Sequence, residues 1–239
     1  MKVKQSALFN CIITIYILSF FWFGMFYEYC SAVTSKLLSI FMIICLIRNK
    51  SVITGFGMGS LLGSAFLVGY VFTTLFAVDR GMAFTGVFKY LWIVIFLMEY
   101  NRQREEEKAC FYDVIPYVGT VMCIIGFAAY YIPAAKSHMY SNGRLLGFIQ
   151  YANTFALLLL VGVIITCDKE KMRIRDYVCS AFMIVGIGLS GSRIVMVLAM
   201  LVMICILIRH GNRVLLTEIV LLSVTAAAYV LIGGNMETV

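Results

Sequence analysis

The chain has 239 residues, of which 62% are hydrophobic and 13% are charged, and its mean hydropathy is +0.96. Soluble domains are typically about half apolar and about a quarter charged, so this composition excludes an ordinary soluble domain and indicates an integral membrane protein. The formal net charge is +7. The basic residues lie in short clusters between apolar runs, which is typical of orientation in a membrane. No DNA- or RNA-binding motif is present, so no nucleic-acid partner is expected.

The cysteines and the common catalytic motifs point away from metal or nucleotide chemistry. Eight cysteines are scattered along the chain without a CxxC pair, and most lie in apolar runs. Buried cysteine behaves as a small hydrophobic residue, so the pattern predicts neither a disulfide framework nor a metal site. The sequence contains no Walker motif and no HExxH motif. We therefore expect no cofactor.

Taken in chain order, the first apolar run covers residues 5–27 and follows two lysines. It is longer than the core of a signal peptide and lacks a small-residue cleavage site, which predicts a retained first helix. A helix needs about 20 apolar residues to cross a bilayer core of about 30 Å. By that measure the sequence predicts an all-α polytopic transmembrane bundle, a single integral membrane domain over residues 1–239. About nine spans are expected, at 6–27, 31–47, 52–78, 82–99, 109–132, 145–167, 177–191, 193–208 and 214–233.

Basic residues concentrate in the loops that separate alternate spans. Lysine and arginine accumulate in cytoplasmic loops. The clusters therefore predict a cytoplasmic N-terminus and an extracytoplasmic C-terminus for the chain. They consist of Lys2, Lys4, Arg48, Lys50, Arg102, Arg104, Lys108, Lys169, Lys171, Arg173, Arg175, Arg209 and Arg213.

The segment 177–208 contains a single charged residue, Arg193, within the stretch "SGSR". Both flanking loops are basic, so both are expected in the cytoplasm, and the segment must cross the membrane an even number of times. The sequence therefore predicts two short helices that meet at "SGSR" on the outer side. An arginine in a membrane segment is costly and often functional, and its guanidinium can hold a phosphate group through two hydrogen bonds. The alternative is an interfacial anchor whose charge reaches the headgroups.

Four further polar residues accompany Arg193 as candidates. Arg144 lies at the entrance to the sixth predicted span, and Gln150 and Asn153 follow three residues apart, a spacing that places two side chains on one helix face. Lys89 lies about midway along the fourth predicted span. Each has a plainer interpretation: a boundary charge for Arg144, helix-to-helix hydrogen bonds for the amides, and pairing or snorkelling for Lys89. Together they predict a pocket for an anionic lipid headgroup, particularly a pyrophosphate.

Three stretches of the sequence indicate a particular family: "LFAVDRGMAFTGVFKYL", "GRLLGFIQYANTFALLLL" and, some 40 residues later, "LSGSRIVMVLAMLV". In their order and spacing they resemble the O-antigen ligase and polysaccharide polymerase superfamily of membrane proteins. The resemblance covers roughly residues 70–210. It implies a multi-pass protein of the bacterial cytoplasmic membrane, with a surface-polysaccharide ligase or polymerase activity at the outer face.

The resemblance also implies substrates and roles. The donor is a glycan linked to undecaprenyl pyrophosphate, the acceptor is a glycan or a lipid, and neither metal nor nucleotide takes part. By its match to the Ser-Arg motif, Arg193 contacts the donor pyrophosphate, and Arg144 and Asn153 bind or shape the same pocket. Members of the superfamily continue into a large outer loop, whose histidine acts as general base, and then into further helices. The expected base and those later helices therefore lie beyond residue 239, and the chain corresponds to the N-terminal part of such an enzyme.

Two other functions remain open from the sequence. A multi-span transporter of a lipid-linked or anionic small molecule would also need intramembrane charges, although the paired repeats and broken helices of many transporters are not evident. A non-catalytic membrane subunit is the second alternative. The sequence itself does not separate a ligase from a polymerase.

Overall fold

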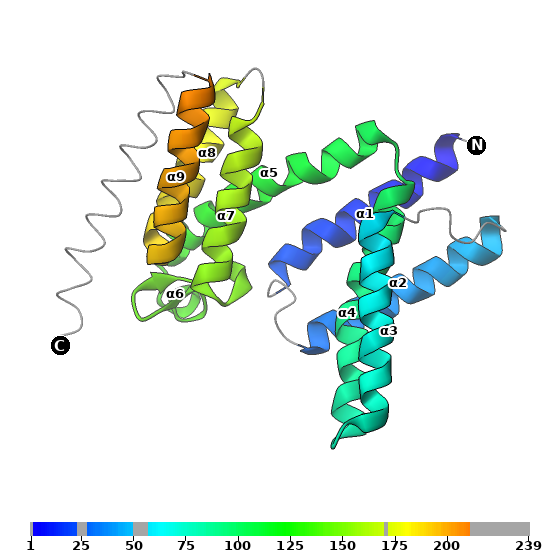
Figure 1. The fold of residues 1–239 in the computed structure, drawn as a ribbon. Helices are drawn as coiled ribbons and strands as arrows, with labels where there is room; N and C mark the ends of the chain where they lie inside the picture. Colours follow the sequence, from blue (N-terminus) through cyan, green and yellow to red (C-terminus); the bar gives the residue numbers. More distant parts are fainter. Residues whose placement is uncertain (1, 23–27, 50–56, 170–171, 211–239) are drawn as a thin grey trace. The chain divides into compact units, whose positions relative to one another are not determined.

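The structure is a computed structural model that describes residues 2–22, 28–49, 57–169 and 172–210 (Figure 1). Within these ranges the chain forms nine α-helices, one short 3-10 helix and a two-stranded hairpin, so the all-α prediction is confirmed. The chain divides into two compact units, Met1–Ala109 and Cys110–Val239.

The first unit is built around its last helix, which packs against the two helices before it. Asp79 caps the N-terminus of this helix, α4 (Arg80–Arg102). Its carboxylate accepts a hydrogen bond from the backbone N–H of Met82 at 2.9 Å, a common N-terminal cap. The hydroxyl of Ser35 donates to the carbonyl of Phe88 and joins two of the helices. The helices are α1 (Lys2–Phe21), α2 (Glu28–Asn49), α3 (Met58–Phe76) and α4 (Arg80–Arg102).

The second unit begins within α5 (Glu105–Ala129). The elements that follow are α6 (Pro133–Met139), β1 (Tyr140–Ser141), β2 (Arg144–Leu145), η2 (Gly147–Ile149), α7 (Ala152–Cys167), α8 (Ile174–Ser190) and α9 (Arg193–His210). Helix α7 packs along α8 and also contacts α9, and the three run side by side in Figure 1. Phe155, Leu159 and Met183 are fully buried in the core. At Gly186 a Cβ atom would lie 2.7 Å from a Leu159 methyl group, so glycine allows these helices to approach closely.

Every apolar run predicted up to residue 208 contains a helix, but the prediction of nine spans is wrong for the part of the chain that the structure describes. Three of the described helices are long and apolar enough to cross a membrane: Met58–Phe76, Arg80–Met98 and Glu105–Ala129. Others are shorter, such as the 16 residues of α7, which reach about 24 Å at about 1.5 Å per residue. The predicted span 214–233 lies outside the described residues. The composition and these three candidate spans make the chain a candidate membrane protein.

The largest difference from the predicted elements lies before α7. The sixth span was expected to begin at residue 145, but α7 begins at Ala152. The preceding residues form a hairpin in which Ser141 pairs with Arg144, and both residues of its turn, Asn142 and Gly143, have positive φ angles of 50° and 73°. Asn-Gly is a strong signal for such a two-residue turn, so the sequence carries a hairpin signal that the apolar pattern alone conceals.

Candidate functional site

The turn between α8 and α9 contains the "SGSR" stretch. Helix α8 ends at Ser190, and Gly191 adopts a left-handed conformation with φ of 62°, which glycine accommodates without steric cost. The N–H of Gly191 donates to the carbonyl of Gly188 at 3.1 Å, and the N–H of Ser192 donates to the hydroxyl of Ser190 at 3.3 Å. Helix α9 then begins at Arg193. The predicted break between two helices at this point is confirmed.

Arg144 connects this turn to the hairpin and to α7. Its Nε donates to the carbonyl oxygen of Ser190 at 2.8 Å, and its Nη2 donates to Oδ1 of Asn153 at 2.9 Å. The Ser190 carbonyl lies at the C-terminal end of α8, where carbonyls lack helical partners and a positive charge is favourable. Arg144, which was predicted as a site residue, therefore contacts both the turn that precedes Arg193 and a second predicted site residue, Asn153.

Contacts between the hairpin and Gly126 hold the backbone of Arg144 in place. The next residue, Leu145, is fully buried. Its side chain lies against Gly126, so closely that a Cβ atom added to Gly126 would lie 2.9 Å from a Leu145 methyl group. The hydroxyl of Tyr140, the strand partner of Leu145, donates to the carbonyl of Gly126 at 3.2 Å. Packing thus fixes the backbone from which the Arg144 side chain extends.

Gln150 lies before α7 and not within a helix as predicted. It precedes α7 and has a positive φ of 62°, so the prediction that it shares a helix face with Asn153 is wrong. Its Nε2 donates to the carbonyl of His138 at 3.1 Å. This contact joins the end of α6 to the start of α7, so Gln150 stabilises the connecting segment.

Arg193 is the first residue of α9, and it is exposed. Among the described residues its guanidinium has no hydrogen-bond or ion-pair partner. A guanidinium at the start of a helix lies close to the first backbone N–H groups, which also favour an anion. Lys89, by contrast, belongs to α4 in the first unit, and its participation in this site stays a prediction.

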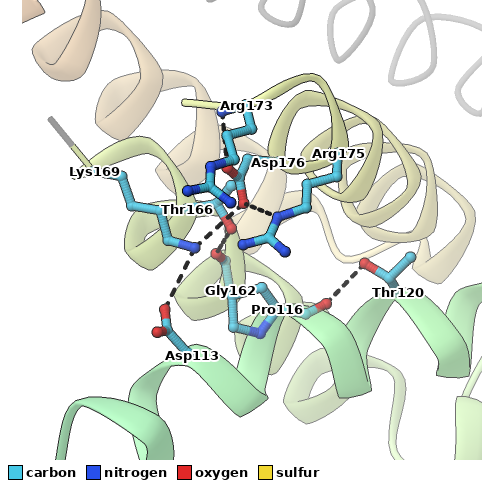
Figure 2. Close-up of polar contacts among 9 residues, drawn as sticks. All are labelled: Asp113, Pro116, Thr120, Gly162, Thr166, Lys169, Arg173, Arg175 and Asp176. Atoms are coloured by element: carbon cyan, nitrogen blue, oxygen red, sulfur yellow. Dashed lines mark hydrogen bonds and ion pairs between the residues drawn. The ribbon is translucent and has the colours of Figure 1, made fainter. Parts of the chain in front are cut away.

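A charged cluster lies near the other end of α8, where Lys169 binds two carboxylates (Figure 2). Its Nζ lies 3.3 Å from Oδ1 of Asp176 and 3.4 Å from Oδ1 of Asp113. Asp176 also accepts a hydrogen bond from the N–H of Arg173 at 2.9 Å, and its Oδ1 lies 3.9 Å from Nε of Arg175. The cluster connects α5, the segment after α7 and the first turn of α8.

The sequence pattern predicts only a basic loop in this region, and the contacts of Asp113 and Asp176 with Lys169 were not predicted. An acidic residue in the first turn of a helix is a recognised start signal, and Asp176 fits it, but nothing local indicates that Asp113 approaches from α5. Burial by itself would raise the pKa of Asp176, but the Arg173 N–H, Lys169 and Arg175 outweigh burial and lower that pKa. Burial would lower the pKa of Lys169, and the carboxylates of Asp176 and Asp113 raise it overall.

The described residues contain no group of three or more His, Cys, Asp or Glu side chains arranged to hold a metal ion. The chain was compared with protein-family models, with curated proteins and with solved structures, and none of them matches. The resemblance to the O-antigen ligase and polysaccharide polymerase superfamily therefore stays a prediction.

Proposed function

We propose that this chain forms the donor-binding part of a surface-polysaccharide ligase or polymerase in the bacterial cytoplasmic membrane. Its donor is a glycan on undecaprenyl pyrophosphate, and the acceptor is a second glycan or a lipid. One observation carries the proposal: Arg144 bonds to both Asn153 and Ser190, so two of the three stretches that resemble the superfamily meet in space, although Arg144 and Ser190 are 46 residues apart.

In this proposal Arg193 contacts the pyrophosphate. Its guanidinium is exposed at the start of α9, and a guanidinium binds phosphate oxygens through two parallel hydrogen bonds. During transfer, the bond between the anomeric carbon and the pyrophosphate oxygen breaks as the acceptor oxygen attacks. Negative charge then develops on the leaving pyrophosphate, and Arg193 stabilises it. The proton of the acceptor hydroxyl passes to a general base, which the resemblance assigns to a histidine.

The two ends of α8 support the proposed orientation. The basic residues Arg173 and Arg175 lie at its beginning, and the turn that leads to Arg193 lies at its end, 17 residues later. That length corresponds to about 26 Å along the helix. If the basic end is cytoplasmic, the Arg193 turn faces the outer side. The proposal retains a multi-pass topology, in which neighbouring protein shields the shorter apolar helices.

The test is Arg193→Ala in the native host, with the wild-type gene removed and surface glycan measured. We expect glycan transfer to fall by about 100-fold or more, the range for loss of a group that stabilises transition-state charge. Arg175→Ala is the matched control, because it removes an exposed arginine from the other end of the same helical hairpin. Normal surface glycan in the Arg193 variant at normal protein level would refute the proposal. Loss of solute or lipid flux without loss of transfer would favour the transporter.

A further inference from the structure

We infer that Arg144 is a positioning residue, whose guanidinium holds the turn Ser190–Arg193 (the SGSR turn) in place and does not bind the donor. The inference rests on the proposed function in one respect, namely that the turn places Arg193 against a pyrophosphate. It differs from the expectation, drawn from the resemblance, that Arg144 itself binds or shapes the ligand pocket.

The hydrogen bonds of Arg144 are the first evidence. Its Nε and Nη2 both donate to protein acceptors at ordinary distances, 2.8 Å to the Ser190 carbonyl and 2.9 Å to Asn153 Oδ1. A guanidinium has donors in a fixed planar fork, so two bonds on separate elements fix its orientation as well as its position. The side chain is thus bonded to the ends of α8 and α7 at once.

The conformation of the SGSR turn is the second line of evidence. Gly191 at its centre is left-handed, and its backbone samples many conformations when unconstrained. Inside the turn, Ser190 Oγ accepts from the N–H of Ser192 at 3.3 Å, which is a long hydrogen bond. The contact from Arg144 to the Ser190 carbonyl fixes the turn from outside, at the residue directly before Gly191.

The position of Arg193 depends on this turn because Arg193 is the first residue of α9. The N–H of Met196 donates to the carbonyl of Ser192 at 2.9 Å, so the first turn of α9 begins from the same residue. A displacement of the SGSR turn would therefore move Arg193 together with the first N–H groups of α9. Small displacements of a group that stabilises a transition state are costly to rate, which makes Arg144 important without ligand contact.

Hydrogen exchange of the purified, full chain in lipid nanodiscs tests the inference without any enzymatic assay. We expect Arg144→Ala to raise the exchange rate of the amides of Gly191, Ser192 and Met196 by roughly tenfold or more, the scale set by hydrogen bonds to charged groups. Arg144→Lys should raise it comparably, since one ammonium cannot span both acceptors. Asn153→Ala should raise it less, because the bond to Ser190 remains. Unchanged exchange in all three variants would overturn the inference.

Nanodiscs that contain undecaprenyl pyrophosphate separate this inference from the proposed function. Arg193→Ala should leave exchange of the SGSR turn unchanged in the free protein and should remove any protection that the lipid confers. If the lipid protects nothing in the wild-type chain, the proposed function fails, whereas the exchange rates of the Arg144 variants still decide the positioning role. Where transfer is measurable, Arg144→Lys should lower kcat more than it changes the donor KM, because Arg193 is retained. A change confined to KM would instead indicate that Arg144 contacts the donor.

Discussion

Replacement of Asp176 with asparagine removes a charge that the fold surrounds with positive partners. The Asp176 side chain is 5% exposed, and its two oxygens face the Lys169 ammonium at 3.3 Å and the Arg173 N–H at 2.9 Å. Hydrogen bonds to charged groups contribute about 1.5–3 kcal/mol. Asparagine keeps a carbonyl oxygen for the Arg173 N–H but loses the ionic contact and the favourable charge at the start of α8. We therefore expect the free energy of unfolding to fall by about 1–2 kcal/mol.

Asp113→Asn is the matched control for this change, because Asp113 contacts the same ammonium from a side chain that is 54% exposed. Exposed ion pairs contribute about 0–1 kcal/mol, so the Asp113 variant should lose clearly less stability than the Asp176 variant. The measurement is reversible unfolding in mixed lipid and detergent micelles, followed by circular dichroism. Equal losses in the two variants, or no loss from Asp176→Asn, would refute the reasoning that burial makes the Asp176 contact the stronger one.

Two further predictions concern pH and close packing. The pKa of Asp176 is lowered and that of Lys169 is raised. The contribution of Asp176 to the free energy of unfolding is therefore complete above the ordinary aspartate pKa, and it is lost as pH falls through the lowered pKa. The Lys169 contribution is complete below the ordinary lysine pKa and lost as pH rises through the raised value. The free energy of unfolding measured across pH should fall at both the acid and the alkaline end. Asp176→Asn should reduce the fall at the acid end, and an unchanged fall there would contradict this. Gly186→Ala places a Cβ atom 2.5 Å from Cys123 Sγ and 2.7 Å from a Leu159 methyl group, so overpacking should cost about 1–3 kcal/mol. Cys123→Ala should recover part of that loss, and Gly59→Ala, where nothing lies within 4 Å, serves as the control. Equal stability of the Gly186 and Gly59 variants would show that the core yields without cost.

The apolar pattern of the sequence was enough to locate the long helices, but it did not predict α6. Long apolar runs favour helices because a membrane segment must satisfy its backbone hydrogen bonds internally, and each such run up to residue 208 contains one. The break at Gly191 was also predictable, since basic loops flank a segment with a single charge. The number of candidate spans was not predictable, and the sixth span shows why: Leu145 at the end of the hairpin and the 3-10 helix Gly147–Ile149 occupy residues that the apolar pattern assigned to it.

The sequence by itself therefore determined the all-α, strongly apolar character of this protein, the position of the turn before Arg193, and the identity of its candidate polar residues. Tertiary structure alone decided how those residues pair. Arg144 reaches Ser190 across 46 residues, and Asp113 reaches Lys169 from a different helix. Such contacts depend on how helices with buried glycines pack against one another, and periodicity within a single segment carries no information about a partner on another.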